Sequence, residues 1–460
     1  MSFKVSHIAL SERKVLLRTL DVLVIIFSLW ISFQSGIQDY IEFTNVLIYE
    51  WLITLIFYFF LFGEIFQLYD LTISNNRFKI VRSLFLASFI TTLFFTFTPF
   101  LSPSLPENRL QIIYLFLLII LPVLVWRFLY LWILFSPKYF KDILIISHSS
   151  RLGQLLELIK DDSFHNVCYY LSNEENEGYK NYVNIIAADL YQLVKSKNVK
   201  EVIISTRGFS SDIISKLNKD IILLFEEGIN IKSYESFYEE ITYRIPKEYL
   251  DYHFYKNINL SKNSDNKFYM VFHRILDIII SIIGLFCFIF LIPLIFIVNL
   301  LANRGPLFYT QKRVGKKGKI FKIFKLRSMI VNAESEGAVY AKINDKRITV
   351  FGKFLRNTRL DEVPQFFNIL KGDMSIIGPR PERPEFVKDL EEKIPFYAIR
   401  HVVKPGLTGW AQVKYPYAGT LEEQEIKLRY DLYYIKEQSA FLDFKIIIKT
   451  ITTVLFFRGQ

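Results

Sequence analysis

A short segment near the C-terminal end, residues 356–381, combines the residue types needed for phosphate chemistry. It holds two adjacent carboxylates, Asp361 and Glu362, among several basic side chains. A carboxylate can act as a nucleophile, a base or a metal ligand on a phosphate, and arginine and lysine bind the negative charge of that phosphate. The basic candidates in this segment are Arg356, Arg359, Lys371 and Arg380.

The same two carboxylates also have a structural interpretation. Asp, Glu and Pro are all favoured in the first turn of a helix, so Asp361, Glu362 and Pro364 are also consistent with the start of a helix over 362–370. Taken alone, the pair fits a helix start better than a catalytic site. The choice depends on the elements that precede the segment.

Four apolar segments in the first part of the chain have the length required to cross a membrane. Hydrophobic residues make up 52% of the 460 residues. The segments are 16–34, 47–67, 82–101 and 110–134, each near the roughly 20 residues that a bilayer requires. Basic residues precede the first, fill the second connection and follow the fourth, so the N-terminus and everything after residue 135 are expected in the cytoplasm. Buried helices of a large soluble protein are the competing interpretation.

A different pattern follows over residues 139–257. Short β-rich runs alternate with amphipathic helical stretches, which predicts a small, parallel, Rossmann-like α/β domain. The expected strands are 142–147, 166–171, 201–205 and 230–234, and the helices include 151–161 and 210–227. The turn from Ser147 to Gly153 lacks the three-glycine spacing that brings a backbone close to a pyrophosphate. We therefore do not expect this domain to bind a dinucleotide.

A polar linker over 258–267 leads into a fifth apolar run, which extends from Ile278 to Asn303 without a charge. Basic residues flank both of its ends, so the positive-inside rule is satisfied at both ends only when both lie in the cytoplasm. Pro293 lies in the middle of the run, where it breaks or kinks a helix. A re-entrant helix over about 275–303, which enters one leaflet and returns, accounts for both observations. A simple fifth span is the alternative, and it would place the C-terminal part outside the cytoplasm.

Positive charge is concentrated in the C-terminal part of the chain. Residues 267–460 hold 31 Lys and Arg against 18 Asp and Glu, a net charge of +13 that exceeds the +11 of the whole chain. Between Arg304 and Asn332, nine basic residues and no acid are interleaved with large apolar residues. Such a segment fits an anionic membrane surface or a phosphate held there. Nucleic-acid binding is the rival use of this pattern, but the position directly after a membrane-embedded run favours the lipid surface.

Several other chemistries find little support. The only cysteines, Cys168 and Cys287, exclude a disulfide framework and a zinc-type cluster. The histidines are scattered, with only His273 and His401 in the last domain, which argues against Ser/His/Asp chemistry. The separated Asp motifs of a processive glycosyltransferase are not found. Transfer of a phosphorylated group between a soluble nucleotide and a lipid phosphate fits better, because it requires mainly charge neutralisation and usually a divalent cation.

A series of short motifs runs in order through the last part of the chain. They are His273-Arg274, Asp277, Pro293, Gly305–Phe308, Gln311–Gly315, Phe324–Met329, Asp345–Thr349, Leu360–Gln365, Gly372–Ser375, Gly378–Pro381 and Lys404–Trp410. On these motifs, residues 267–460 resemble the polyprenyl-phosphate sugar-1-phosphate transferases, the monotopic phosphoglycosyl transferases that initiate bacterial glycan assembly. The four spans and the α/β domain further resemble the large subclass of that family. Ile292 departs from the serine that members often have before the helix-breaking proline.

The resemblance implies a ping-pong mechanism. Asp361 is expected to attack the β-phosphate of a UDP-sugar, so that UMP leaves and the sugar phosphate is held as an acyl phosphate. The phosphate of undecaprenyl phosphate then attacks that intermediate. Glu362 is expected to assist the nucleophile or a bound Mg²⁺, with Asp361 near the metal as well. The candidates for phosphate or substrate contacts are Lys325, Arg327, Arg356, Gln365, Arg380 and Pro381, and the re-entrant helix carries Arg274, Asp277 and Pro293.

The expected architecture is a membrane protein with four transmembrane helices over 1–138, a Rossmann-like α/β domain over 139–257, a linker over 258–267 and a C-terminal α/β catalytic domain over 268–460. The resemblance implies a UDP-sugar, undecaprenyl phosphate and membrane lipid as partners, no nucleic acid, and a place in the bacterial inner membrane with the active site on the cytoplasmic face. A homodimer is one expected assembly. Glucose, galactose and N-acetylated hexoses all remain open as the sugar. A catalytically silent scaffold of a glycan assembly complex is the alternative function, and the intact Asp361–Glu362 pair argues against it.

Overall fold

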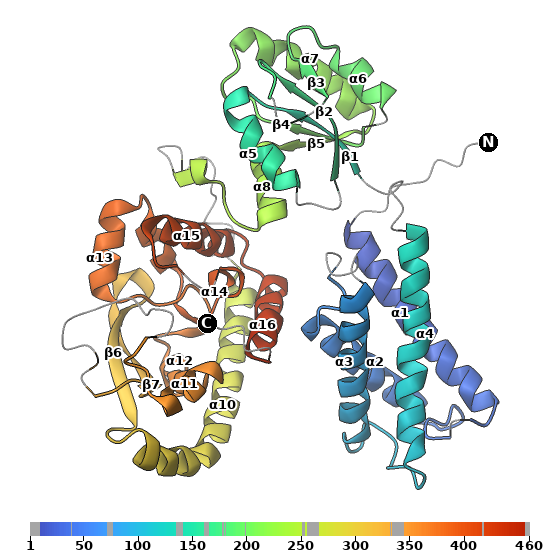
Figure 1. Ribbon diagram of the computed structural model, residues 1–460, viewed down its shortest axis with the longest axis vertical. Coiled ribbons are helices and arrows are strands. Elements are labelled where there is room, and N and C mark those ends of the chain that lie inside the picture. The colour runs from blue at the N-terminus through green and yellow to red at the C-terminus, as the bar shows by residue number, and fades with distance from the viewer. Residues whose placement is uncertain are drawn as a thin grey trace. The chain divides into compact units, whose positions relative to one another are not determined.

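The computed structural model describes residues 10–455, apart from gaps at 38, 71–76, 135–140, 161–164, 177–178, 180, 198, 251–253, 255–265, 332, 334–344 and 416–417. The chain divides into two compact units, Met1–Phe237 and Tyr238–Gln460 (Figure 1). The division falls within helix α8 (Tyr234–Thr242), so the second unit begins before the boundary expected at residue 257. Most of the expected linker, 258–265, lies outside the described residues.

Four long apolar helices form the first part of the N-terminal unit. They are α1 (Leu10–Gln34), α2 (Ile48–Ile65), α3 (Arg77–Thr96) and α4 (Leu110–Leu134). Together with α10 (Lys267–Ala302), they are the five described helices that are long and apolar enough to cross a membrane. Phe27, Phe57 and Val125 are more than half exposed, as expected of helix surfaces that face lipid rather than water. These features indicate a membrane protein.

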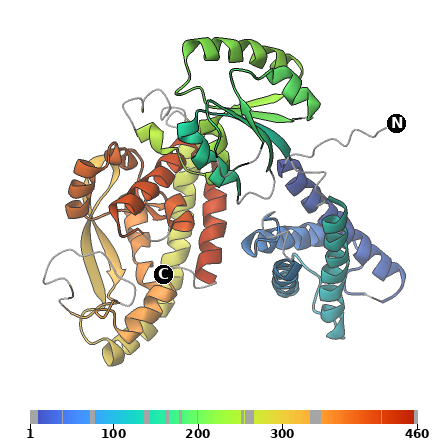
Figure 2. The same cartoon turned by 45° about the horizontal axis from the view of Figure 1, so that its top comes forward.

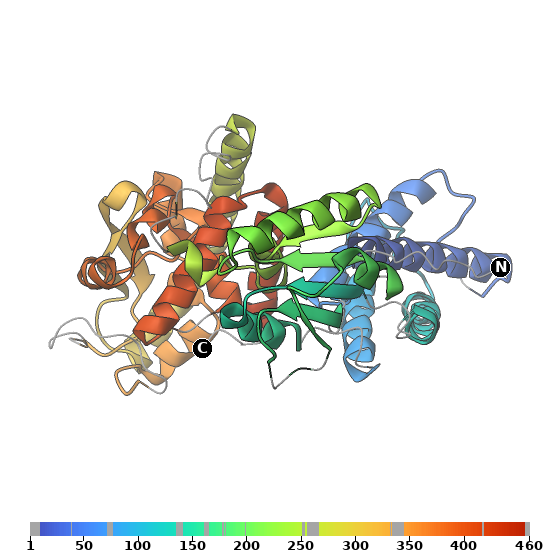
Figure 3. The same ribbon diagram turned by 90° about the horizontal axis from the view of Figure 1, so that it is seen from above.

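A parallel sheet forms the second part of the N-terminal unit. Its strand order is β3-β2-β1-β4-β5, and every neighbouring pair is parallel. The strands are β1 (Lys141–Ile146), β2 (His165–Ser172), β3 (Tyr182–Asn184), β4 (Glu201–Ile204) and β5 (Asn230–Ser233). Helices α6 (Leu190–Ser196) and α7 (Ser211–Glu226) cover one face and α5 (Ser149–Lys160) the other (Figures 1 and 3). The predicted parallel α/β domain is therefore confirmed, with the short edge strand β3 added.

The central strand of this sheet shows why the sequence folds in this way. Residues 143–146 of β1 are fully buried, as a continuous aliphatic run must be when helices cover both faces of a sheet. The buried residues Leu144, Leu171 and Val202 pack with Leu217 and Leu224 of α7 in one apolar core.

The C-terminal unit consists of helices around two small pairs of strands. β6 (Phe308–Val314) and β7 (Ile320–Leu326) form an antiparallel ribbon, and β8 (Ser375–Ile377) pairs in parallel with β9 (Gly406–Thr408). The helices are α11 (Val350–Asn357), α12 (Gln365–Lys371), α13 (Pro384–Lys393), α14 (Trp410–Lys414), α15 (Leu421–Lys436) and α16 (Ala440–Leu455). One apolar core around Trp410, Leu432 and Ile446 joins helices α12 through α16 and includes Tyr249 and Leu250, while Leu355 of α11 packs in a second core with Leu326. A C-terminal α/β domain was predicted and is confirmed.

The 36-residue helix α10 belongs entirely to the C-terminal unit. Near its start, Tyr269 donates a hydrogen bond to Asp443 of α16 at 2.7 Å, and Figure 2 shows the two helices side by side. At its end, Asn303 donates to the carbonyl oxygen of Arg327 at 2.9 Å. Pro293 lies inside the helix without ending it, and the ribbon bends in its second half toward β6 (Figure 1). The re-entrant placement in a membrane stays a prediction.

Candidate active site

The two adjacent carboxylates lie in a turn between α11 and α12. Arg359 adopts a left-handed backbone conformation with φ of 59°, and one 3-10 turn, Leu360–Glu362, follows it. Asp361 is only 6% exposed and Glu362 only 7%. Helix α12 begins after them, and no side chain caps its N-terminus. The pair thus lies in a helical turn just before α12, which begins at Gln365 rather than at the expected residue 362, and a helix start alone does not explain the burial of two carboxylates.

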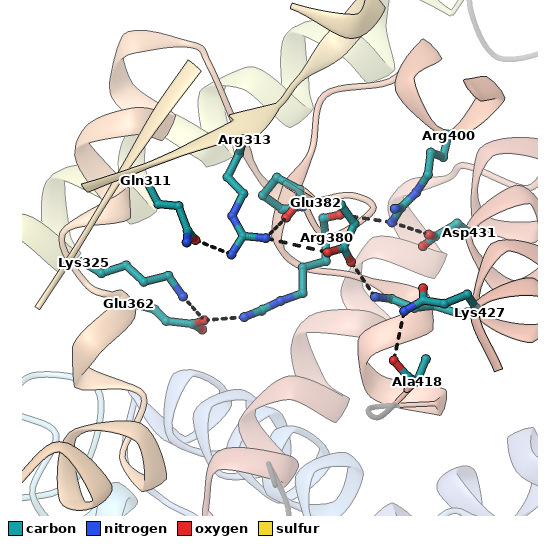
Figure 4. Close-up of polar contacts among 12 residues, drawn as sticks. Gln311, Arg313, Lys325, Glu362, Arg380, Glu382, Arg400, Ala418, Lys427 and Asp431 are labelled. Atoms are coloured by element: carbon teal, nitrogen blue, oxygen red, sulfur yellow. Dashed lines mark hydrogen bonds and ion pairs between the residues drawn. The ribbon is translucent and has the colours of Figure 1, made fainter. Parts of the chain in front are cut away.

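Glu362 is the centre of a cluster of basic side chains (Figure 4). Its Oε1 accepts hydrogen bonds from Lys325 Nζ at 3.1 Å and from Arg380 Nη2 at 3.0 Å, and its Oε2 accepts one from Arg359 Nη1 at 3.2 Å. Burial alone would raise the pKa of Glu362, but the charges of Lys325, Arg380 and Arg359 hold this pKa well below its usual range. Glu362 therefore stays ionised and binds basic side chains from three separate segments of the chain.

Asp361 lies beside this cluster, but its pKa is raised rather than lowered. Within the described part of the chain, the side-chain ion pairs of the two carboxylates all fall on Glu362. Burial raises the pKa of Asp361 to about 6 and the charge of Glu362 adds to the rise, while Lys325, Arg356 and Arg359 oppose it. Asp361 is thus mostly ionised at neutral pH and has no direct ion pair with any described residue, which suits a nucleophile.

Two further predicted contacts lie close in sequence to the pair. Arg356, in the last turn of α11, donates from Nε to Ser328 Oγ at 2.9 Å, and its charge lowers the pKa of Asp361. Gln365, the first residue of α12, is 4% exposed, and its Nε2 has no hydrogen-bond partner among the described residues. An unsatisfied buried donor costs about 1–3 kcal/mol, so Gln365 leaves a donor available for a bound oxygen.

Arg327 does not point at the carboxylate pair. Its guanidinium donates to the carbonyl oxygens of Pro306 at 2.7 Å and Met329 at 3.1 Å, and also to that of Asn303. These bonds fasten the end of α10 to the end of β7. A phosphate contact by Arg327 is not supported by this geometry, because the N–H groups already serve backbone oxygens. Lys371 is also elsewhere, since it is exposed and pairs with Asp373 at 3.0 Å.

Arg274 and Asp277 connect the first half of α10 to the elements that follow the turn with the two carboxylates. Arg274 donates to the carbonyl oxygens of Ile369 and Leu370 at 2.7 and 2.8 Å, where it caps the end of α12. Asp277 Oδ1 accepts from Ser375 Oγ at 2.9 Å and from the Ile376 N–H at 2.8 Å. The apolar helix and the carboxylate turn are therefore parts of one connected structure.

A second set of buried charges lies next to Arg380 (Figure 4), and the sequence predictions did not include it. Lys427 Nζ donates to Glu382 Oε1 at 2.7 Å, and Arg400 Nη2 donates to Asp431 Oδ2 at 2.8 Å. All four residues are more than nine-tenths buried.

One signal for this set was present in the sequence. Lys427 and Asp431 are four residues apart on α15 and lie next to the buried Leu428 and Leu432. Charges therefore occupy the apolar side of an amphipathic helix, where they need buried partners.

A divalent cation fits the site only with help from a substrate. Among the residues that the structure describes, no group of three or more His, Cys, Asp or Glu side chains can hold a metal. Mg²⁺ is usually bound through one or two carboxylates and the phosphates of a substrate. Asp361 is the ligand that this geometry offers, because both oxygens of Glu362 already accept hydrogen bonds from basic side chains.

The described residues of the α/β domain offer no comparable arrangement at the edge where a doubly wound sheet binds nucleotides. The first amide of α5, on Ser149, donates to Asn173 Oδ1 at 2.9 Å, and the amide of Ser150 faces His148 Nδ1 at 3.4 Å. These donors are thus not free for a phosphate. A cavity of about 180 Å³ beside α7 is lined mainly by apolar residues, and the amine of Lys216 there donates to the carbonyl oxygens of Ile186 and Ala188.

Comparisons with known proteins converge on the C-terminal unit. The sequence profile described as bacterial sugar transferase matches residues 268–457. A UDP-N-acetylgalactosamine-undecaprenyl-phosphate N-acetylgalactosaminephosphotransferase of Aeromonas hydrophila is 46% identical over 187 residues, which are 41% of this chain and 44% of the relative. A UDP-glucose:undecaprenyl-phosphate glucose-1-phosphate transferase of Klebsiella pneumoniae is 43% identical over 188 residues, 40% of each chain.

The matched segment thus spans less than half of the length of these two relatives. A shorter relative, an uncharacterized sugar transferase of Bacillus subtilis, is 36% identical over 190 residues, which are 41% of this chain and 90% of that protein. The carboxylate turn, its cations and the buried charges beside Arg380 all lie within the matched residues. The chain belongs to the bacterial sugar transferase family.

Proposed function

We propose that this protein transfers a sugar-1-phosphate from a UDP-sugar to undecaprenyl phosphate, with release of UMP. The observation that carries the proposal is a buried, ionisable Asp361 beside Glu362. Three basic side chains converge on Glu362, namely Lys325, Arg359 and Arg380. A site that holds one carboxylate ready to attack and several cations nearby suits a reaction between two anions.

The first half-reaction forms an acyl phosphate on Asp361. A carboxylate oxygen attacks the β-phosphorus of the UDP-sugar, the new O–P bond forms, and the bond from that phosphorus to the bridging oxygen breaks. UMP leaves with the bonding electron pair. In the second half-reaction, a phosphate oxygen of undecaprenyl phosphate attacks the same phosphorus and displaces Asp361. The product is undecaprenyl-diphospho-sugar, and the carboxylate is restored.

Glu362 is proposed to act through the cations rather than on the substrate. A buried carboxylate bonded to Lys325, Arg359 and Arg380 holds three long side chains in fixed positions. When a diphosphate enters, these preorganised cations stabilise the negative charge that develops on it. Burial alone would raise the pKa of Glu362, but the cations around it hold this pKa well below its usual range. A general base needs a pKa nearer to neutrality. The low pKa therefore agrees with a role in holding the cations.

Mg²⁺ is the expected cofactor, and Asp361 together with substrate phosphate oxygens would hold it. When bound, it would neutralise charge on the diphosphate. The residues of the chain supply the other functions. Asp361 provides the attacking oxygen, and Lys325, Arg356 and Arg380 orient the phosphates of the substrate.

The lipid substrate requires the site to lie at a membrane surface. Helix α10 is apolar over most of its length. Both its first half and its end are hydrogen-bonded to other elements of the C-terminal unit, which also carries Asp361. We propose that α10 enters one leaflet of the bacterial inner membrane and returns, which leaves the active site on the cytoplasmic face. A reporter fused after Gln460 tests this topology, and a periplasmic signal contradicts it.

The donor sugar is open between the classes that the relatives use. The Aeromonas relative is named for N-acetylgalactosamine and the Klebsiella relative for glucose, at similar identity. The decisive assay measures UMP release by purified protein with Mg²⁺, undecaprenyl phosphate and a panel of UDP-hexoses and UDP-N-acetylhexosamines. Release with at least one donor supports the proposal, and no release with any of them contradicts it.

A further inference from the structure

The loop that carries Arg380 is held at consecutive carbonyl groups by four different donors. These donors are Gly406 N–H to Pro379 O at 2.9 Å, Arg400 Nη2 to Arg380 O at 3.0 Å, Arg313 Nη1 to Pro381 O at 3.0 Å and Val314 N–H to Glu382 O at 2.9 Å. Pro379 and Pro381 have no N–H group, so the loop cannot join a regular ladder of hydrogen bonds. Two arginine side chains supply part of what a strand neighbour would otherwise provide.

Each of these two arginines has an acidic partner. Arg400 is 3% exposed and donates to Asp431 at 2.8 Å. Arg313 Nη1 lies 3.7 Å from Glu382 Oε2. The other oxygen of Glu382, Oε1, accepts a hydrogen bond from Lys427 Nζ at 2.7 Å. Removal of one member of a buried ion pair leaves the other charge uncompensated, and the remaining side chain must move or bind elsewhere. The acidic residues therefore fix the arginines, and the arginines fix the loop.

We propose that Arg400 with Asp431, and Arg313 with Glu382 and Lys427, are positioning residues that direct the Arg380 guanidinium toward an anionic diphosphate. The inference rests on the proposed function, because it takes the donor's diphosphate as that anion. The Arg400–Asp431 pair provides the cleaner test of the two. It reaches Arg380 through a backbone carbonyl, whereas the charge of Arg313 also lies near Lys325.

The expected effect follows from geometry. A displacement of about 1 Å in a group that contacts the transition state can lower the rate about 100-fold. The Asp431→Asn variant keeps the shape of the side chain and removes the charge that holds Arg400. We expect kcat/KM for UMP release to fall about 10- to 100-fold. The Arg400→Lys variant is a second test that keeps the buried positive charge, but its single amine cannot replace the guanidinium, which donates from Nη2 to Asp431 and the Arg380 carbonyl and from Nη1 to the hydroxyl of Tyr397.

The matched control is Asp389→Asn, which removes an exposed ion pair with Lys393 on α13, 2.5 Å long. This variant is expected to keep the activity of the unmodified protein. It shows the effect of removing an acid–base pair that does not touch the loop. Thermal unfolding of each variant, followed by circular dichroism, identifies any that fail to fold.

Coupling to Arg380 distinguishes positioning from general structural support. In an Arg380→Ala background, neither Asp431→Asn nor Arg400→Lys should lower kcat/KM any further, because the group they position is gone. If the losses multiply instead, the pair supports the fold and does not position Arg380, and the proposal is overturned. Full activity of both single variants overturns it as well.

Binding of inorganic pyrophosphate with Mg²⁺, measured by calorimetry, provides a test that needs no turnover. We expect weaker pyrophosphate binding in Asp431→Asn and no further loss when Arg380→Ala is added. If this coupling is seen but no UDP-sugar yields UMP, the proposed function fails and the positioning role stands. If UMP is released but the coupling is absent in both assays, the function stands and the positioning role fails. A protein that binds no pyrophosphate contradicts the positioning role.

Discussion

The chain contains two α/β regions that hold their backbones in different ways. In the Rossmann-like domain, a regular parallel sheet satisfies the backbone, and the first amides of α5 bond to Asn173 and face His148. In the C-terminal unit, short irregular segments are held by buried charged side chains such as Arg327 and Arg400. The candidate active site lies in the second region, so the region with the regular parallel sheet is not where the phosphate chemistry is expected.

The buried charges of the second region have a cost in free energy. Burial of an ion pair costs desolvation energy that its Coulomb attraction often fails to recover, so a buried pair is weak grounds for inferring stability. The charges around Glu362 and Glu382 therefore need a reason other than stability, and preorganisation toward an anion provides one. In the α/β domain, the buried Glu201 pairs with two cations, Lys141 and Lys232, whereas three cations converge on Glu362 beside a second carboxylate. Four predictions test this contrast, starting with the largest effect.

Replacement of Asp361, the proposed nucleophile, should have the largest effect. The Asp361→Asn variant keeps the size of the side chain but cannot form an acyl phosphate, so UMP release should fall about 1,000-fold or more. The measurement is kcat/KM for UMP release with the preferred donor. The matched control is Asp373→Asn, whose carboxylate pairs with the exposed Lys371 outside the site. Activity of Asp361→Asn within tenfold of the unmodified protein would contradict the assignment.

Neutralisation of Glu362 should have the next largest effect. In Glu362→Gln, the side chains of Lys325, Arg359 and Arg380 lose the negative charge on which they converge, and their mutual repulsion should spread them apart. We expect kcat to fall about 100-fold, on the scale of a misplaced catalytic contact. Single-turnover UMP release separates this loss from slower product release. An unchanged single-turnover rate would show that Glu362 does not organise the cations.

The pH dependence should follow Asp361. Burial raises the pKa of Asp361 to about 6, and the neighbouring charge of Glu362 adds to the rise. The attacking form is the deprotonated one, so kcat/KM should be highest above this pKa and fall about tenfold for each pH unit below it. A profile measured from pH 5 to pH 8 checks the prediction. Activity that stays constant down to pH 5 would remove Asp361 from the role of the titrating nucleophile.

The smallest effect is expected in the α/β domain. Asn173→Ala removes the hydrogen bond to the first amide of α5, which should lower the free energy of unfolding by about 1 kcal/mol. Chemical denaturation measures this change. Because the domain is not expected to bind the donor, kcat/KM and the KM for the UDP-sugar should remain unchanged. A large rise in that KM would place part of the donor site in the α/β domain and would end the contrast between the two regions.

Sequence periodicity was sufficient for the parts of the fold that local chemistry determines. The apolar runs at 16–34 and 110–134 became α1 and α4, and the aliphatic run after Lys141 became the buried strand β1. Such elements bury continuous apolar surface, so their pattern is visible in the chain itself. The short strand β3 was missed because three residues carry too little pattern.

The composition of the site was only partly visible for a physical reason. Asp361, Glu362, Lys325 and Arg380 stood out as charged residues inside short motifs, but the partner of each charge depends on which distant segments meet in the fold. Arg327 illustrates the limit: its charge suggested a phosphate, while its geometry serves backbone oxygens at the end of α10. Arg400 and Asp431 are 31 residues apart in sequence, so nothing local joins them.

The most direct test of the account is a search for the covalent intermediate. Purified protein is incubated with its UDP-sugar and Mg²⁺ in the absence of undecaprenyl phosphate, and its intact mass and peptides are measured. The account predicts a burst of UMP equal to the amount of enzyme and the mass of a sugar phosphate on the peptide that contains Asp361, with discharge when undecaprenyl phosphate is added. UMP release that requires both substrates together, with no adduct on the protein, would contradict it.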